Sequence, residues 1–201
     1  MSKLRIVLWV AVAVLLFVLG AVSISGFSML GRDGGQASAL KPGAPLGGAF
    51  QLVDQNNAPV TETVFRQKPS VTLFGYTHCP DVCPTALSDM AQWQKELGAD
   101  ADKLRFIFVT VDPERDTPAT LKDYLGSFDP HLHGITGAPD AVAAVAKEYR
   151  VYYKKVPTEN GDYSMDHTAI VYLMDKNGHF VAPFSLRRTP EASADDLRRY
   201  L

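Results

Sequence analysis

The first long pattern in the chain is an apolar run close to its start. Residues 6–24 carry no charged side chain, and at about 1.5 Å per residue a helix of this length nearly crosses the hydrocarbon core of a bilayer. Lys3 and Arg5 precede the run, so the positive-inside rule predicts a cytoplasmic N-terminus. We therefore expect residues 1–30 to be a cytoplasmic N-terminus and a single transmembrane anchor. The alternative is a signal peptide cleaved near residues 21–23, although the run is longer than the apolar region of most such signals.

The pattern changes after the apolar run, first to a linker and then to a folded domain. Residues 31–45 are rich in glycine, serine, alanine and proline, a composition typical of a flexible linker. Residues 46–201 contain separate apolar segments with the periodicities of strands and helices. About 160 residues are enough to form a hydrophobic core without disulfide bonds. We expect one domain over this range.

The apolar segments of the domain predict a mixed α/β order. Short β-branched and aromatic runs predict strands at 49–53, 58–61, 70–76, 104–111, before 135, 168–174 and 179–184. Helical spacing, Thr-Pro starts and alanine-rich stretches predict helices at 86–97, 117–128, 140–149 and after 190. Residues 54–57 predict an N-terminal hairpin, and the Asn-Gly turn at 177–178 predicts a second one near the C-terminus.

This order indicates a thioredoxin-like fold, in which helices flank a mixed sheet. A strand followed by a cysteine loop and a helix, closed by a C-terminal hairpin and helix, is the thioredoxin arrangement. Another doubly wound α/β fold is the alternative, but such a chain does not normally close with an antiparallel hairpin.

Composition and charge restrict the possible functions. The formal net charge is -2 at pH 7, which argues against a nucleic-acid-binding protein because these proteins present a strongly basic face. The chain has two cysteines, too few for a disulfide framework. Both lie in one short segment, so they indicate a single site.

That segment is Tyr-Thr-His-Cys-Pro-Asp-Val-Cys-Pro, residues 76–84, directly after a predicted buried strand. If Cys79 and Cys83 are both helical, their Cα atoms lie about 6 Å apart on one face, within reach of a disulfide or of a shared metal ion. A helix N-terminus favours the thiolate, which is both a nucleophile and a metal ligand. Two buried, inert cysteines are the alternative interpretation, but the neighbouring residues are not typical of a core and predict an exposed loop.

Two thiolates and an imidazole suit copper(I), whereas zinc prefers more protein ligands. Among the five histidines, His167 lies in a loop that enters a buried strand, and in a thioredoxin fold this loop faces the cysteine loop. A histidine that caps a backbone group is the alternative there. The other four are His78, which adjoins Cys79 but whose side chain is expected to diverge from it, and His131, His133 and His179, which are expected to be exposed.

Three motifs resemble the signatures of the Sco/SenC family: residues 76–84, then Val-Asp-Pro-Glu-Arg-Asp-Thr-Pro at 111–118, then Asp-His-Thr at 166–168. The resemblance implies a copper site, for Cu(I), Cu(II) or both, made of Cys79, Cys83 and His167. Asp112 is a candidate for orienting the site or tuning His167, with an ordinary turn and helix cap as the alternative. Asp81 is a candidate for stabilising a cupric form or for partner docking, with a first-turn helix acid favoured by the dipole as the alternative. Met165 is a candidate soft ligand, with an incidental loop methionine as its alternative.

The resemblance also implies a function, partners and a location. Family members assist assembly of the dinuclear copper centre of cytochrome c oxidase, by delivering copper, by reducing the cysteines of that centre, or by both. The implied partners are the copper-bearing oxidase subunit, and another copper chaperone or an extracytoplasmic thiol reductant. We expect an inner-membrane protein whose domain lies in the periplasm, or in the intermembrane space if it is mitochondrial. Redox signalling and thiol–disulfide reduction are the alternatives, and a peroxidase is disfavoured because no activating residue adjoins Cys79.

Overall fold

The computed structural model describes residue 9, residues 46–159 and residues 161–201. The predicted anchor (1–30) and linker (31–45) therefore lie outside the described residues, apart from residue 9. Within the part that is described, no helix combines the length and the apolar character needed to cross a bilayer. The described part of the folded domain begins at Leu46, and the domain boundary itself stays a prediction.

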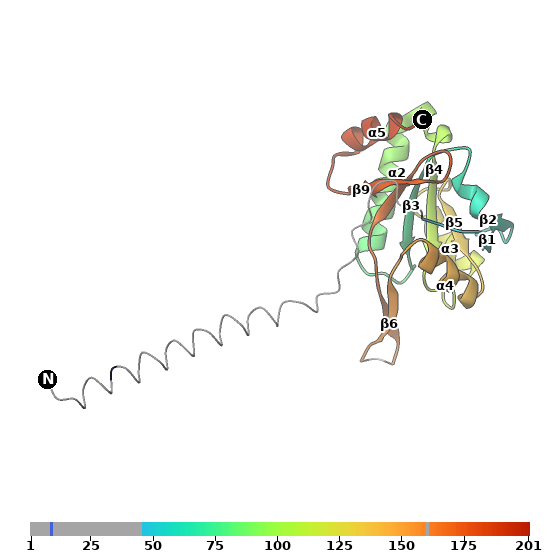
Figure 1. Ribbon diagram of the computed structural model, residues 1–201, viewed down its shortest axis with the longest axis vertical. Helices are drawn as coiled ribbons and strands as arrows, with labels where there is room; N and C mark the ends of the chain where they lie inside the picture. Colours follow the sequence, from blue (N-terminus) through green and yellow to red (C-terminus); the bar gives the residue numbers. More distant parts are fainter. Residues whose placement is uncertain (1–8, 10–45, 160) are drawn as a thin grey trace. The chain divides into compact units, whose positions relative to one another are not determined.

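A seven-stranded mixed sheet forms the centre of this domain (Figure 1). Its strand order is β2-β1-β5-β4-β3-β8-β9, and the three adjacent strands β5, β4 and β3 are parallel while the outer strands pair antiparallel. The strands are β1 (Gln51–Asp54), β2 (Pro59–Thr61), β3 (Ser70–Gly75), β4 (Arg105–Thr110), β5 (His133–Thr136), β8 (Val171–Met174) and β9 (Phe180–Phe184). The sheet confirms the predicted thioredoxin-like α/β architecture, including the N-terminal hairpin β1–β2.

Sequence features at the ends of elements explain several boundaries. Asp54 accepts hydrogen bonds from the backbone N–H groups of Asn56 and Ala58, which closes the β1–β2 turn. Thr117 and Thr189 are the N-caps of two helices, each followed by proline at the first helical position. Between residues 46 and 201 the four α-helices are α2 (Val82–Leu97), α3 (Pro118–Gly126), α4 (Pro139–Glu148) and α5 (Pro190–Arg198), with 3-10 turns η1 (Glu62–Phe65) and η2 (Gly98–Lys103).

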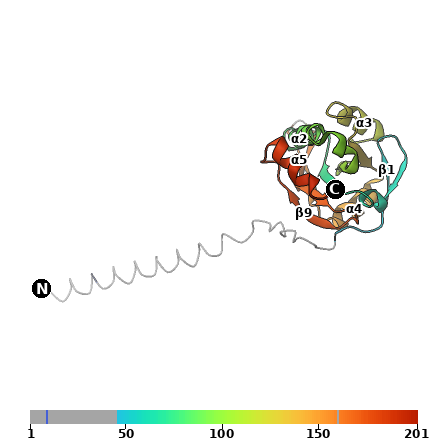
Figure 2. The same ribbon diagram turned by 90° about the horizontal axis from the view of Figure 1, so that it is seen from above.

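The helices cover both faces of the sheet. A Cβ at Gly75 of β3 would meet Cys83 of α2, and α2 packs along α5, so these two helices lie side by side on one face (Figure 2). The next residue back, Phe74, points to the opposite face because side chains alternate along a strand. There its ring lies 5.6 Å from that of Tyr149, which follows α4. The buried strands between these layers hold the end of β3 and the start of α2 in fixed positions.

A second, separate sheet lies outside the elements that the sequence predicts. Residues Tyr153–Pro157 (β6) and Tyr163–His167 (β7) form an antiparallel hairpin that projects from one end of the domain (Figure 1). The sequence predicts a loop around His167, and the structure corrects this: His167 is the last residue of β7 and pairs with Tyr153. The predicted strand at 168–174 is correspondingly shorter and begins at Val171.

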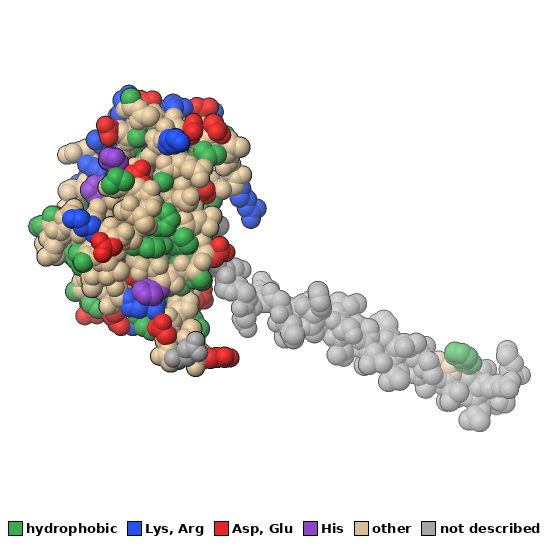
Figure 3. Space-filling view, turned by 180° about the vertical axis from the view of Figure 1, so that it is seen from behind, with side chains coloured by type: hydrophobic (Ala, Val, Ile, Leu, Met, Phe, Trp, Pro, Cys, Tyr) green, Lys and Arg blue, Asp and Glu red, His purple; other side chains and the backbone are tan. Residues whose placement is uncertain are grey.

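The surface of the domain carries charges of both signs. On the face seen in Figure 3, acidic and basic side chains are interspersed, with small hydrophobic areas between them. Such a mixture is typical of a domain surface in contact with water.

Candidate metal centre

The two cysteines lie where β3 passes into α2, but in different local structures. The backbone N–H of Cys79 donates to the carbonyl of Tyr76 at 3.2 Å, which forms a tight turn after the strand. The helix begins only at Val82, with Asp81 at the N-cap position, so Cys83 is helical and Cys79 is not. The helical geometry considered for both cysteines is therefore wrong for Cys79. A turn followed by a helix nevertheless brings the two sulfur atoms onto the same side.

Burial of the pair is greater than the sequence suggests. Cys79 is 9% exposed and Cys83 is 0% exposed, whereas the sequence predicts an exposed loop. The reason is Gly75, whose missing side chain leaves room for Cys83: a Cβ there would lie 2.5 Å from Cys83 Sγ and 3.0 Å from the ring of Phe108. Both cysteines are free thiols. Only Cys79 therefore offers part of its surface to another molecule.

The thiols influence each other through a shared hydrogen bond. The side chain of Cys83 donates to Cys79, as do the backbone N–H groups of Cys83 and Asp81, and these contacts lower the pKa of Cys79 to about 5. Because it donates this hydrogen bond and is buried, Cys83 has a raised pKa. The free pair is thus a thiolate at Cys79 with a thiol at Cys83, and the helix N-terminus contributes to that preference.

His167 completes a cluster of three donors. The two sulfur atoms and a ring nitrogen of His167 all lie within 4.8 Å of one another, and Cys83 Sγ is 3.7 Å from His167 Nε2. The other ring nitrogen, Nδ1, lies 3.3 Å from the carbonyl oxygen of Met165, which can only accept. This contact assigns the proton to Nδ1 and leaves the Nε2 lone pair directed at the cysteines.

The donor set fits a soft metal ion. Ligands bonded at about 2.0–2.3 Å, the range known for imidazole and thiolate on zinc, must lie within about 4.6 Å of each other. The three donors all lie within 4.8 Å of one another, so at most a small contraction would bring them within this limit. Two sulfurs with one imidazole form a low-coordinate, soft site of the kind that selects copper(I).

The other histidines lie elsewhere. The ring of His78 is exposed, and its Nδ1 contacts the hydroxyl of Thr77. His131 and His179 are exposed and pair with Asp129 and Asp175. His133 is the exposed first residue of β5. Within the described residues, no further group of potential ligands of this kind was found.

Asp112 and Asp81 make other contacts in the structure, and their roles at the site stay predictions. Asp112 is buried, and its carboxylate accepts hydrogen bonds from Arg115 and from the hydroxyl of Tyr163, not from His167. The exposed Asp81 makes no side-chain cap of α2, and it acts on Cys79 through its backbone N–H. Met165 is buried in the core and contacts His167 through its carbonyl oxygen.

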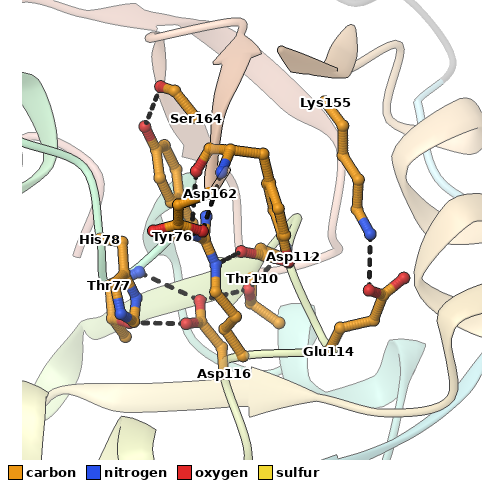
Figure 4. A network of polar contacts seen from close by, with 12 residues as sticks. Tyr76, Thr77, His78, Thr110, Asp112, Glu114, Asp116, Lys155, Asp162 and Ser164 are labelled. Carbon is orange, nitrogen blue, oxygen red and sulfur yellow. Dashed lines mark hydrogen bonds and ion pairs between the residues drawn. The ribbon is translucent and has the colours of Figure 1, made fainter. Parts of the chain in front are cut away.

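Sequence reasoning missed Asp116, which anchors the cysteine loop (Figure 4). Its buried carboxylate accepts hydrogen bonds from the backbone N–H and hydroxyl of Thr77, at 3.1 and 2.6 Å, and from the hydroxyl of Thr110 at 2.6 Å. Burial raises the pKa of Asp116, and the three hydrogen bonds oppose that shift. Asp116 lies in the motif at 111–118, which could have drawn attention to it. The motif alone does not show that its carboxylate binds Thr77 at the end of β3.

Comparison with known proteins identifies the family. The family model described as SCO1/SenC matches residues 38–201, which include the whole described domain. The chain belongs to the SCO1/SenC family. It is 34% identical over 166 residues to an SCO2-like protein of Rickettsia conorii, an alignment that covers 82% of this chain and 81% of that one.

SCO1/SenC relatives from eukaryotes are longer. Protein SCO2, mitochondrial, of Saccharomyces cerevisiae is 38% identical over 160 residues, covering 78% of this chain and 53% of the yeast protein. The Bos taurus SCO2 homologue is 37% identical over 174 residues, covering 85% of this chain and 65% of the bovine one. The chain therefore spans between half and two thirds of these two relatives.

Solved SCO1/SenC structures include proteins with copper bound. ScoI of Bradyrhizobium japonicum with copper bound is 60% identical, with a TM-score of 0.75 and coverage of 78% of this chain and 99% of that one. Yeast Sco1 with copper bound is 37% identical, with a TM-score of 0.70 and coverage of 77% and 87%. The domain thus has the fold on which these relatives bind copper.

Proposed function

We propose that this protein binds copper as cargo through Cys79, Cys83 and His167 and delivers it to the dinuclear copper centre of cytochrome c oxidase. The observation that carries the proposal is the cluster of two sulfurs and one imidazole nitrogen within 4.8 Å. The copper-bound ScoI at 60% identity supports copper as the metal. The oxidase as destination follows from the resemblance to the Sco/SenC family.

Delivery by ligand exchange needs ligands that an acceptor can replace one at a time. Cys83 is fully buried, whereas Cys79 is 9% exposed and His167 is half-buried at the base of the hairpin. We propose that an incoming cysteine of the acceptor first replaces His167, then Cys79, and that Cys83 releases the ion last. Copper would then stay bound to at least two ligands throughout the transfer.

The proposed location follows from the N-terminal segment. Residues 1–30 would hold the protein in the inner membrane, and residues 31–45 would let the domain move above the surface. The domain would lie in the periplasm, or in the intermembrane space of a mitochondrion. A copper chaperone would load the site there, and an extracytoplasmic thiol reductant would keep the cysteines reduced.

A thiol–disulfide reductase is the second candidate, favoured by the lowered pKa of Cys79. In this reaction the Cys79 thiolate attacks a disulfide of the oxidase subunit and releases one partner thiolate. Cys83, once deprotonated, attacks the mixed disulfide, so that the partner leaves as a dithiol and Cys79–Cys83 becomes the disulfide. Two electrons pass to the partner. The same reaction on a signalling protein would give a redox-signalling role.

Copper titration of the full chain in detergent, with and without His167, separates these functions. We expect one copper ion per reduced protein and a thiolate-to-copper(II) charge-transfer band that disappears in His167→Ala. Disulfide reduction should persist in the same variant, because it requires only the cysteines. If His167→Ala bound copper as tightly as the wild type, the proposed ligand set would be wrong.

A further inference from the structure

We propose that Arg115 is a positioning residue for copper binding, because it fastens the β6–β7 hairpin to the domain and thereby holds His167 over the two cysteines. The proposal rests on the proposed function, since it takes His167 as a copper ligand. Arg115 lies in the loop between β4 and α3, and its guanidinium is a cation without an acceptor atom, so it is not itself a ligand.

The contacts of Arg115 converge on the first residue of β7. Its Nη1 donates to the carbonyl oxygen of Tyr163 at 2.9 Å, and its guanidinium lies 3.8 Å from the centre of the Tyr163 ring. Its Nε donates to Asp112, whose other carboxylate oxygen accepts from the hydroxyl of Tyr163 at 2.8 Å. Arg115, Asp112 and Tyr163 thus form a closed set of contacts around the carboxylate of Asp112, which is labelled in Figure 4.

The hairpin depends on such side-chain contacts for its position. Sheet β6–β7 is separate from the seven-stranded sheet, and a two-stranded hairpin is marginally stable by itself. His167 stands at the far end of β7 from Tyr163, about 13 Å away at the usual rise per residue. Tyr163 lies beside the hairpin turn and His167 at the hairpin base, so Arg115 restrains the end of the hairpin that is far from its connections to the domain. Without that restraint the hairpin can pivot about its base, which turns the imidazole of His167 relative to the cysteines.

A second set of contacts lies near His167. Its ring meets the ring of Tyr76 edge-on at 5.4 Å between centres, and the hydroxyl of Tyr76 bonds to Ser164 of β7 at 3.0 Å. Arg115 also reaches this group, since its guanidinium lies 5.8 Å from the centre of the Tyr76 ring. Arg115 is thus the side chain that joins the two places where β7 meets the domain.

An exposed ion pair provides a natural control. Lys155 of β6 bonds to Glu114, so it connects the same hairpin to the same loop as Arg115 does. Its side chains are 44% and 55% exposed, whereas those of Arg115 and Asp112 are 16% and 0% exposed. Exposed pairs are screened by water and contribute little, while the largely buried Arg115 side chain, 16% exposed, makes charge-assisted hydrogen bonds in a fixed geometry.

The cysteines are held independently of this arginine. Asp116 fixes Thr77 at the start of the cysteine loop, and Cys83 is packed against Gly75. Loss of Arg115 should therefore displace His167 and leave the dithiol in place. This separation gives a readout that general destabilisation would not produce.

The test measures copper(I) affinity by ligand competition, using the full chain in detergent, alongside the alkylation rate of Cys79 without metal. We expect Arg115→Gln to weaken copper binding about 10–100-fold, as outer contacts of metal sites commonly do, with the alkylation rate unchanged. Arg115→Lys should lose less, because it keeps the charge beside Asp112 but not the second contact with Tyr163. The control Glu114→Gln removes the exposed ion pair but leaves Lys155 beside the Tyr163 ring, and it should bind copper within about twofold of the wild type.

A double-mutant comparison decides whether Arg115 acts through His167. If it does, Arg115→Gln has no further effect on copper affinity in a His167→Ala protein. Suppose that His167→Ala weakens copper binding but Arg115→Gln binds copper like the wild type. That result would overturn the inference about Arg115 and leave the proposed function standing. An additional loss in the double variant would also overturn the inference. If Arg115→Gln fails to fold, Arg115→Lys takes its place. A folded Arg115→Lys protein with wild-type copper affinity overturns the inference. The inference is supported if Arg115→Lys lowers copper affinity in the wild-type protein but not in the His167→Ala protein.

Discussion

Cys83 Sγ and His167 Nε2 lie 3.7 Å apart, although 84 positions separate the two residues in the chain. One comes from the first turn of α2 and the other from the end of β7, so the contact exists only when the hairpin is docked on the domain. The dithiol, in contrast, is formed within a single loop and helix. The proposed copper site therefore combines a locally determined pair of sulfurs with a distant imidazole.

The different pKa values of the two thiols predict how the alkylation rate of the reduced, metal-free protein depends on pH. Since the pKa of Cys79 is lowered to about 5, its thiolate is present above that value and is lost as the pH falls through it. The rate of alkylation by iodoacetamide should be nearly constant from pH 7 down to about 6 and then fall with a midpoint near 5. A midpoint near 8.5, the value of a free cysteine, would contradict the proposed hydrogen bond.

The matched variant for this experiment is Cys83→Ala. The side chain of Cys83 supplies the largest of the contacts that lower the pKa of Cys79. Its removal should move the alkylation midpoint upward, toward the value of an ordinary thiol. An unchanged midpoint would mean that the helix N-terminus and backbone N–H groups alone account for the shift.

Oxidation should exclude copper. Because the two sulfurs lie within 4.8 Å of each other, a small movement can join them at the 2.05 Å length of a disulfide, after which neither is a thiolate ligand. We expect protein oxidised to the Cys79–Cys83 disulfide to bind no copper(I), and one equivalent to bind again after reduction. Mass spectrometry of alkylated protein reports the thiol state, and copper analysis after gel filtration reports the metal. Stoichiometric binding by the disulfide form would contradict the assignment of the sulfurs as ligands.

Much of the fold was predictable because its signals are local. The apolar β-branched run at Ser70–Gly75 and the Thr117-Pro118 start of α3 each carry their own structural preference. The hairpin of β6 and β7 was missed because its strands are largely polar and exposed, without a regular apolar alternation. It is defined by contacts with distant residues, above all Arg115 with Tyr163.

The candidate site was predictable to a similar degree. The spacing of Cys79 and Cys83 after a strand indicated a dithiol, and the family motifs indicated His167. The burial of Cys83 could not be predicted, because it depends on the packing of α2 against Gly75 in the folded protein. The role of Asp116 was hidden for the same reason, since Thr77 is 39 positions away. The membrane anchor at residues 1–30 stays a prediction.

Replacement of Asp116 should loosen the cysteine loop. Asp116→Ala leaves three buried or half-buried donors on Thr77 and Thr110 without an acceptor, and each unsatisfied group costs about 1–3 kcal/mol. We expect the free energy of unfolding in urea to fall by about 2–4 kcal/mol. Asp116→Asn should lose less, because its amide oxygen still accepts. The exposed Asp123 on α3 is the control, and Asp123→Ala should change stability by no more than about 0.5 kcal/mol. Equal effects of Asp116→Ala and Asp123→Ala would show that the loop does not depend on this carboxylate.

The substitution Gly75→Ala should displace Cys83 and so disturb the proposed copper site. In Gly75→Ala the new Cβ would lie 2.5 Å from Cys83 Sγ and 3.0 Å from Phe108, so the sulfur must move away from the sheet. Overpacking of a core costs about 1–3 kcal/mol, and the displaced sulfur should also weaken copper(I) binding. Gly126→Ala is the matched control, because a Cβ there meets nothing within 4 Å and alanine is the better helix former. Urea denaturation and copper competition on both variants measure the two effects. If Gly75→Ala bound copper with wild-type affinity, Cys83 could move and still bind the ion. Close packing of Cys83 against β3 would then not be required for copper binding.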